Sequence, residues 1–279
     1  MVPGKILIIG CVSRDLLHLP SGQSARTIGG AGLYTAIAAR AAGADVTILA
    51  PRLENTKEFG SLPAGKVNWI GPACADDEFP FLEIRHHGND QATLIAAGWG
   101  AESRLTPQVL PDDLHQFDIV HIAALSSALK QLEFLREIKS KSQCKISAGT
   151  YARVAYGETE TVRELFSLCD YVFMNENESK AVFNETSFPL KASEQQIICI
   201  TKGKSGAQIF SGNKQIDLAG LTVEEIDPTG AGDTFAGTFL AEIVQQHSLE
   251  QCAQAAIERS ALVITKPGPA AIAELIGKT

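Results

Sequence analysis

The sequence predicts a layered α/β domain built on a mostly parallel sheet. Short hydrophobic runs, typical of buried strands, alternate along the 279 residues with stretches of helical periodicity. This βαβ alternation favours a sheet covered by helices, with ligands bound at the carboxyl ends of its strands. Because neither an internal repeat nor a low-complexity linker interrupts the pattern, we expect one domain over residues 1–279.

Hydrophobic runs mark the expected strands of the core. The first begins at Lys5 and ends at Gly10 with four consecutive aliphatic residues between them. The later runs are 46–50, 119–123, 145–148, 171–175 and 196–201, and helices are expected near 131–139, 162–168 and 179–183. Residues 79–86 and 91–97 break the alternation, because they are typical of two strands joined around a Gly-Asn-Asp turn. An edge hairpin is therefore expected within 79–97.

The segment from Asp227 to Gly237 predicts a helix that begins at an anion-binding turn. Hydrophobic residues at helical spacing start after Gly230, and a proline before it favours an extended approach. The first amides of a helix have no partner within it, and Gly230 and Gly232 leave them open to an anion. Asp233 adds a carboxylate that can accept a proton from a hydroxyl attacking phosphorus. Helix capping alone would explain one acidic residue, but not two glycines with a second acid.

This run closely resembles the C-terminal signature of the ribokinase-like (PfkB) family of sugar and nucleoside kinases. The resemblance implies a three-layer α/β/α fold with a small β lid, formed here by the hairpin within 79–97. It also implies that Asp233 is the catalytic base and that the amides of Gly230, Ala231 and Gly232 form an anion hole. The expected activity is transfer of the γ-phosphoryl group of ATP, with Mg²⁺, to a hydroxyl of a sugar, nucleoside or related polyol.

A second motif resembles the family's N-terminal signature. Gly29 and Gly30 precede an alanine-rich helix, and in the family such paired glycines let the backbone approach the sugar. The residue four places on is usually Asn but here is Tyr34, whose phenol can stack on a base or bond a hydroxyl. Asp15 matches a family acid that binds sugar hydroxyls. Taken alone, the glycines equally fit close packing of a helix on a sheet, and a loop Asp equally fits a turn.

Central and C-terminal segments supply the expected nucleotide site. Asn175 and Glu178 match the family's N-x-x-E element, in which the Glu acts on Mg²⁺ through water and the Asn lies near the phosphates. A helix start with favourable acids is the alternative for this pair, and solvated turn charges are the alternative for Lys202. Many relatives also bind a monovalent cation near 266–270. The residues that the resemblance assigns to the nucleotide are Asn175, Thr201, Lys202, Gly203, Gly206, Thr229 and Gly268.

Two departures from the family pattern bear on the acceptor. Many sugar kinases of the family carry D-x-N-x-R where this chain has residues 147–153, and only Arg153 remains clearly aligned as a substrate-binding residue. A site selects a hydroxyl through paired polar groups, so this loss argues against ribose or fructose phosphate. The stretch 51–67 is also short and lacks the acidic-glycine segment that many members carry before the lid. The sequence leaves the acceptor open.

Composition and charge restrict the partners. With a formal net charge of −8 and no basic block, the chain is a poor prospect for nucleic acid, and no apolar stretch is long enough for a membrane span. A secretory signal pattern is missing, and the six cysteines are scattered without a C-x-x-C pair, so we expect a cytoplasmic protein with reduced thiols. Family lids commonly pack against each other, which makes a homodimer through the lid a further expectation.

Two other functions fit the same fold. A non-catalytic nucleotide or sugar sensor is compatible with the altered substrate motifs, but a sensor does not need Asp233. A kinase of the hydroxymethylpyrimidine or pyridoxal type is disfavoured by the lid-like hairpin. Small-molecule kinase is therefore the function that the sequence favours.

Overall fold

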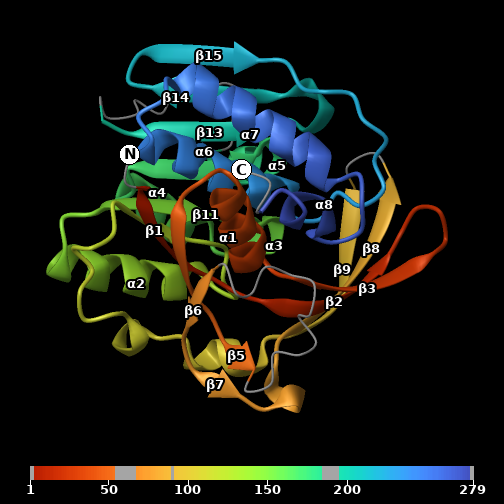
Figure 1. Cartoon of the computed structure of the whole chain (residues 1–279), viewed down its shortest axis with the longest axis horizontal. Helices are drawn as coiled ribbons and strands as arrows, with labels where there is room; N and C mark the ends of the chain where they lie inside the picture. Colours follow the sequence, from red (N-terminus) through yellow and green to blue (C-terminus); the bar gives the residue numbers. More distant parts are fainter. Residues whose placement is uncertain (1–2, 54–66, 89–90, 184–194, 277–279) are drawn as a thin grey trace.

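A nine-stranded sheet forms the centre of the computed structural model, which describes residues 3–53, 67–88, 91–183 and 195–276 (Figure 1). Neighbouring strands from β13 to β6 pair in parallel, and β14 and β15 add two antiparallel strands at one edge. The expected mostly parallel sheet is thereby confirmed. In spatial order the strands are β15 (Lys214–Leu218), β14 (Ala207–Ser211), β13 (Ile197–Thr201), β12 (Tyr171–Asn175), β11 (Lys145–Gly149), β10 (Ile119–Ile122), β1 (Lys5–Ile9), β4 (Asp45–Leu49) and β6 (Asn68–Ile70).

Helices cover both faces of this sheet and give the three layers. Side chains alternate across a strand, and in β1 Ile6 and Ile8 join one hydrophobic cluster whereas Leu7 and Ile9 join the other. The first cluster packs under α1 (Ala31–Ala41), α6 (Ala231–Val244), α7 (Leu249–Val263) and α8 (Ala270–Ala273). The second packs under α2 (Ala128–Lys141), α3 (Ala152–Gly157), α4 (Thr159–Ser167) and α5 (Glu176–Phe183).

A separate four-stranded sheet stands beside the main one and carries the hairpin (Figure 1). Its strands, in spatial order, are β3 (Ser24–Gly29), β2 (Ser13–His18), β8 (Phe81–Gly88) and β9 (Gln91–Gly98). The sequence analysis anticipated β8 and β9 but missed β2 and β3. Treating Asp15 as a loop residue was wrong, because it lies within β2, opposite Thr27 and Leu82. The polar residues at the start of β2 shorten its hydrophobic run and conceal the strand.

Short elements complete the described structure. β5 (Arg52–Leu53) pairs with β7 (Ala73–Cys74), and 3₁₀ turns occur at η2 (Asp76–Glu78), η3 (Gly100–Arg104), η4 (Pro107–Val109) and η5 (Gly203–Ser205). Most of the short stretch 51–67 lies outside the described residues. Within the described ranges, no helix has both the length and the apolar character that a membrane crossing requires. All six cysteines are free thiols.

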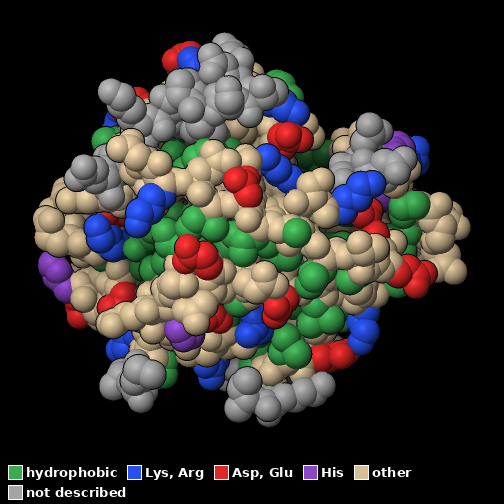
Figure 2. Space-filling view, turned by 90° about the horizontal axis from the view of Figure 1, so that it is seen from above, with side chains coloured by type: hydrophobic (Ala, Val, Ile, Leu, Met, Phe, Trp, Pro, Cys, Tyr) green, Lys and Arg blue, Asp and Glu red, His purple; other side chains and the backbone are tan. Residues whose placement is uncertain are grey.

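Charged side chains of both signs share the surface. Seen from the β15 side of the molecule, Lys and Arg are interspersed with Asp and Glu, and hydrophobic side chains are exposed between them (Figure 2). Among the described residues on this face, no single sign of charge predominates.

Candidate active site

The amino-terminal end of α6 lines a cavity of about 750 Å³ between the main sheet and the small sheet. Gly230 caps the helix in the left-handed region, at φ 75°, and a Cβ there would overlap the ring of Tyr34. A Cβ at Gly232 would meet nothing within 4 Å, so space over the helix start is open to a ligand. At Gly237 a Cβ would overlap the Thr35 carbonyl, which shows how closely α6 and α1 pack. The glycines thus serve both the open helix start and close packing.

Two carboxylates lie near this helix start. Burial raises the pKa of Asp233, in the first turn of α6, to about 6. Burial, with the nearby charge of Asp233, raises the pKa of Glu178 to about 8 although bonds from Asn175 oppose the shift. The Asn175 amide and side chain both donate to Glu178, at 2.8 Å each, and the Glu178 amide donates to Asn175 Oδ1 at 2.9 Å. Asn175 and Glu178 therefore cap the start of α5 together, and both carboxylate oxygens of Glu178 already accept a hydrogen bond.

Asp15 supplies a buried carboxylate on the opposite side of the cavity. Ser13 Oγ donates to Asp15 Oδ1 at 2.6 Å, whereas Oδ2 has no hydrogen-bond partner among the described residues. Burial raises the pKa of Asp15 to about 7, and the charge of Asp227 contributes. A Cβ at Gly29 would overlap the Asp15 carboxylate, and a Cβ at Gly30 would lie 2.5 Å from the Cys11 carbonyl oxygen. Asp15 of β2 and Cys11 of the segment before β2 therefore lie too close to the backbone of Gly29 and Gly30 to leave room for a side chain there.

Tyr34 connects the two sides. Its ring packs on Gly230, and its buried hydroxyl has no partner within the described part of the chain. Burial raises the pKa of the phenol well above its usual value, and the charges of Asp227, Asp15 and Asp233 add to the shift. The hydroxyl is therefore a neutral donor whose partner a ligand could supply.

An aromatic and aliphatic wall, which the sequence analysis missed, completes the cavity. Trp99 and Tyr151 have ring centroids 6.4 Å apart with planes inclined by 55°, and Leu82 and Leu94 of the small sheet lie on the same cavity. His121 also lines it, and burial lowers the pKa of this imidazole to about 3, so it is neutral. Of these residues, only Trp99 and Tyr151 had a signal in the sequence. Trp99 follows the second hairpin strand, and Tyr151 lies two residues before Arg153.

Most of the residues expected at the site line this one cavity. They are Asp15, Gly30, Tyr34, Arg153, Asn175, Glu178, Thr201, Thr229, Gly230, Ala231, Gly232 and Asp233. Five others lie outside its lining. Gly29 ends β3 beside Asp15, Lys202, Gly203 and Gly206 belong to the turn between β13 and β14, and Gly268 lies behind the α6 loop, where its amide donates to Asp227.

The donor set fits a magnesium ion that is held mostly by phosphate and water. No group of three or more His, Cys, Asp or Glu side chains suited to a metal occurs among the described residues. Mg²⁺ typically keeps several waters and takes one or two carboxylates together with substrate phosphates. Asp233 and Glu178 are the carboxylates that line the cavity beside the open helix start, so phosphate and water would supply most of the ligands of such an ion.

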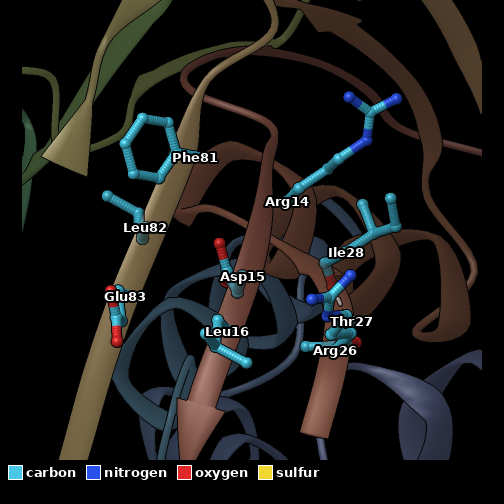
Figure 3. A pocket seen from close by; sticks show the side chains of 9 residues that line it. All are labelled: Arg14, Asp15, Leu16, Arg26, Thr27, Ile28, Phe81, Leu82 and Glu83. Atoms are coloured by element: carbon cyan, nitrogen blue, oxygen red, sulfur yellow. Dashed lines mark hydrogen bonds between the residues drawn. The ribbon is translucent and has the colours of Figure 1, made fainter. Parts of the chain in front are cut away.

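A second cavity of about 420 Å³ lies over β2, β3 and β8. Its lining includes Arg14, Arg26 and Glu83, together with exposed Phe81, and Figure 3 shows these side chains around Asp15 and Leu16. Asp15 and Leu82 line both cavities. The small sheet therefore separates a mixed charged surface from the deeper site.

The family model described as pfkB family carbohydrate kinase matches residues 81–275, and the chain belongs to this family. The fold is the ribokinase fold, and the chain is a phosphotransferase with an alcohol group as acceptor.

Individual relatives include kinases of nucleosides and of ribose. A cytidine kinase of Thermococcus kodakarensis is 26% identical over 271 residues, which span 94% of this chain and 97% of that one. A nucleoside kinase of Burkholderia thailandensis, solved in complex with inosine, superposes with a TM-score of 0.75 at 18% identity and covers 98% of this chain and 99% of its own. An E. coli protein proposed to be a ribokinase II, solved with ATP and Mg²⁺, gives a TM-score of 0.77 at 19% identity and covers 99% and 100%.

Proposed function

We propose that this chain transfers the γ-phosphoryl group of ATP to a hydroxyl of a nucleoside. The observation that carries the proposal is that one cavity joins Asp233 and the open start of α6 to a buried Asp15 and an aromatic wall. Asp233 and the α6 start suit phosphoryl transfer, whereas Asp15 and the aromatic wall suit a ligand with hydroxyls and a flat apolar ring. The similarity to a cytidine kinase over nearly the whole chain supports the same class of acceptor.

The acceptor end provides separate partners for the sugar and the base. Asp15 Oδ2 and the Tyr34 hydroxyl are buried without partners among the described residues, so sugar hydroxyls would satisfy them. Trp99 and Tyr151 offer aromatic surface on which a base can stack. A free pentose would leave that surface without a partner, which favours a nucleoside over ribose.

The transfer step uses the start of α6. Asp233, with a pKa of about 6, is mostly ionised at pH 7 and accepts the proton of the attacking hydroxyl. The amides of Gly230 and Gly232, with the positive end of the helix dipole, stabilise negative charge on the phosphoryl group as it is transferred. The expected Ala231 amide donates instead to the Pro228 carbonyl, at 3.3 Å. When bound, Mg²⁺ would neutralise phosphate charge; Glu178 would contact it through water, and Asn175 would lie near the nucleotide phosphates.

The nucleotide end is proposed to lie beside the turn between β13 and β14. This turn packs on the segment after β15, since a Cβ at Gly206 would overlap the Leu218 carbonyl and lie 2.5 Å from the Gly220 amide nitrogen. The same segment exposes Leu221, Val223 and Ile226, apolar surface that an adenine ring could cover. Thr201 and Lys202 stand at the start of the turn, where they could reach the phosphates.

Two further proposals concern a cation and a partner. The Gly268 amide donates to Asp227, so the 266–270 segment adjoins the α6 loop, where a monovalent cation would support the anion hole. The small sheet exposes Phe81 and Ile95, apolar residues that a second copy of the sheet could cover in a homodimer. Activity in K⁺ compared with a large organic cation, and the mass in solution, test these two proposals.

The experiment that tests the function is ADP release from Mg-ATP with a panel of acceptors. The panel contains cytidine, uridine, adenosine, inosine, ribose, fructose 6-phosphate and inositol, each measured with wild type and with Asp233→Asn. Turnover with a nucleoside that is lost in the variant supports the proposal. ATP binding without ADP release for any acceptor would instead favour a sensor.

A further inference from the structure

A histidine of the small sheet contacts the loop that precedes α6. His86 lies in β8 with 5% of its surface exposed, and its Nε2 is 2.9 Å from Thr229 Oγ1 and 3.3 Å from Asp227 Oδ1. Its Nδ1 is buried and has no hydrogen-bond partner among the described residues. The adjacent His87 is exposed and bonds Thr93 within the small sheet. Successive residues of a strand point to opposite faces, so only His86 faces the main body of the molecule.

Asp227 fixes the geometry of the same loop. The Thr229 amide donates to Oδ1 at 3.0 Å, and the Gly268 amide donates to Oδ2 at 2.7 Å. Burial alone would raise the pKa of Asp227, but bonds from His86, Thr229 and Gly268 together lower it. The carboxylate is therefore ionised, and Nε2 of His86 lies where a proton on it would donate to this buried charge.

The loop between these contacts and α6 is one residue long. Thr229 is followed by Gly230, which caps the helix and packs against the Tyr34 ring. The loop is thus held by Tyr34 on one side and by His86 on another. Along β8, the residues at alternate positions before His86 are Leu82 and Ile84, and both line the cavity. One strand therefore contacts the acceptor space and the loop that carries the anion hole.

We propose that His86 is a positioning residue that aligns the anion hole with the acceptor bound against β8. The inference rests on the proposed kinase function but concerns the alignment of its two halves. Nε2–H donates to Asp227 and holds the Asp227–Gly230 loop at a fixed distance from β8. Loss of this donor displaces the amides relative to the acceptor hydroxyl while both binding surfaces remain. The rate of transfer then falls more than the affinity for either substrate.

A pair of variants with similar length isolates the donor. His86→Gln keeps an N–H near the position of Nε2, and His86→Met fills similar volume without one. With the best acceptor of the panel, we expect His86→Met to lower kcat about 10- to 100-fold with less than about a threefold change in KM for acceptor and ATP, whereas His86→Gln recovers most of the rate. His87→Met, on the opposite face of β8, is the matched control and should leave kcat unchanged.

Several outcomes would overturn the proposal. Equal kcat values for His86→Gln and His86→Met, or a loss confined to KM, would show that the donor does not align the loop. If neither variant folds, ¹⁵N-edited spectra of wild-type imidazoles decide: a proton on Nε2 of His86 supports the proposal and a proton on Nδ1 instead contradicts it. Failure of the kinase function is a separate result, because it would appear as absent wild-type turnover with every acceptor.

Discussion

The two ends of the cavity are built in different ways. At the start of α6, one continuous segment supplies the loop, the open space over Gly232 and Asp233, and glycine conformation fixes their geometry. At the acceptor end, the lining residues come from β2, β8, β9 and the segment after β11, which are distant parts of the chain. The transfer chemistry is therefore local in sequence, whereas acceptor recognition depends on how the small sheet sits on the main sheet.

The largest expected effect follows from removing the base at the local end. Asp233→Asn keeps the size and helix position of the side chain but cannot accept the proton. We expect kcat to fall by about 10³-fold, within the usual range for general-base loss, with ATP affinity nearly unchanged. Turnover is measured by ADP release and affinity by calorimetry. If the variant kept the kcat of wild type, the assignment of the transfer chemistry to the α6 segment would be wrong.

Backbone geometry at the same end gives the next largest effect. Gly230→Ala forces a Cβ into the Tyr34 ring at a positive φ, so the anion hole must shift, and we expect kcat to fall about 100-fold, similar to the loss of one oxyanion donor. Gly22→Ala is the matched control, since Gly22 also has a positive φ, of 83°, but its Cβ would meet nothing within 4 Å. That control should lose about 1 kcal/mol of stability and no activity. Similar kcat losses in both would point to general destabilisation.

A smaller and more selective effect is expected at the acceptor end. Trp99→Ala removes stacking surface, so the KM for a nucleoside should rise about tenfold, corresponding to a stacking contribution of about 1 to 2 kcal/mol, while kcat changes little. Trp69→Phe, in β6 and outside the cavity lining, serves as the control. Should Trp99→Ala lower kcat but leave KM intact, the proposed separation between recognition and transfer would be wrong.

The pH dependence of turnover sharpens the assignment of the base. Because Asp233 must be ionised to accept a proton and its pKa is raised to about 6, log kcat should rise with pH up to about 6 and then level off. Below that value each pH unit should cost about a factor of ten. A profile already flat from pH 5 upward would exclude a base with this pKa.

The last expected effect is on stability rather than on turnover, and it concerns Glu178. Burial raises the pKa of this carboxyl in the folded chain to about 8, above its usual value of 4.5. Between these values the unfolded chain releases a proton that the folded chain keeps, so the stability contributed by this group falls as pH rises. Glu178→Gln cannot ionise and should gain stability relative to wild type across this window, by up to about 1.4 kcal/mol per pH unit. Denaturant unfolding at pH 5 and pH 8 measures the difference, and a constant difference would contradict the account.

The contrast between the local α6 end and the acceptor end, which distant segments build, also explains what could be predicted from the sequence. The α/β fold, the main parallel strands and the glycine turn before α6 follow from local periodicity and backbone preference, and the sequence analysis recovered them. Trp99, Tyr151 and His86 were missed because their roles arise only when distant segments meet. His86 and Thr229 are 143 residues apart, and no local pattern connects them. β2 was missed for a related reason, since its buried Asp15 faces a site that exists only after folding.

The ratio of kcat/KM for cytidine to kcat/KM for ribose, measured by ADP release with Mg-ATP, tests the central claim most directly. If the aromatic wall binds a base next to the α6 site, cytidine or another nucleoside is phosphorylated with the higher kcat/KM, and Trp99→Ala brings the two values closer together. A kcat/KM for ribose that exceeds that of every nucleoside tested, and that Trp99→Ala leaves unchanged, would contradict the claim.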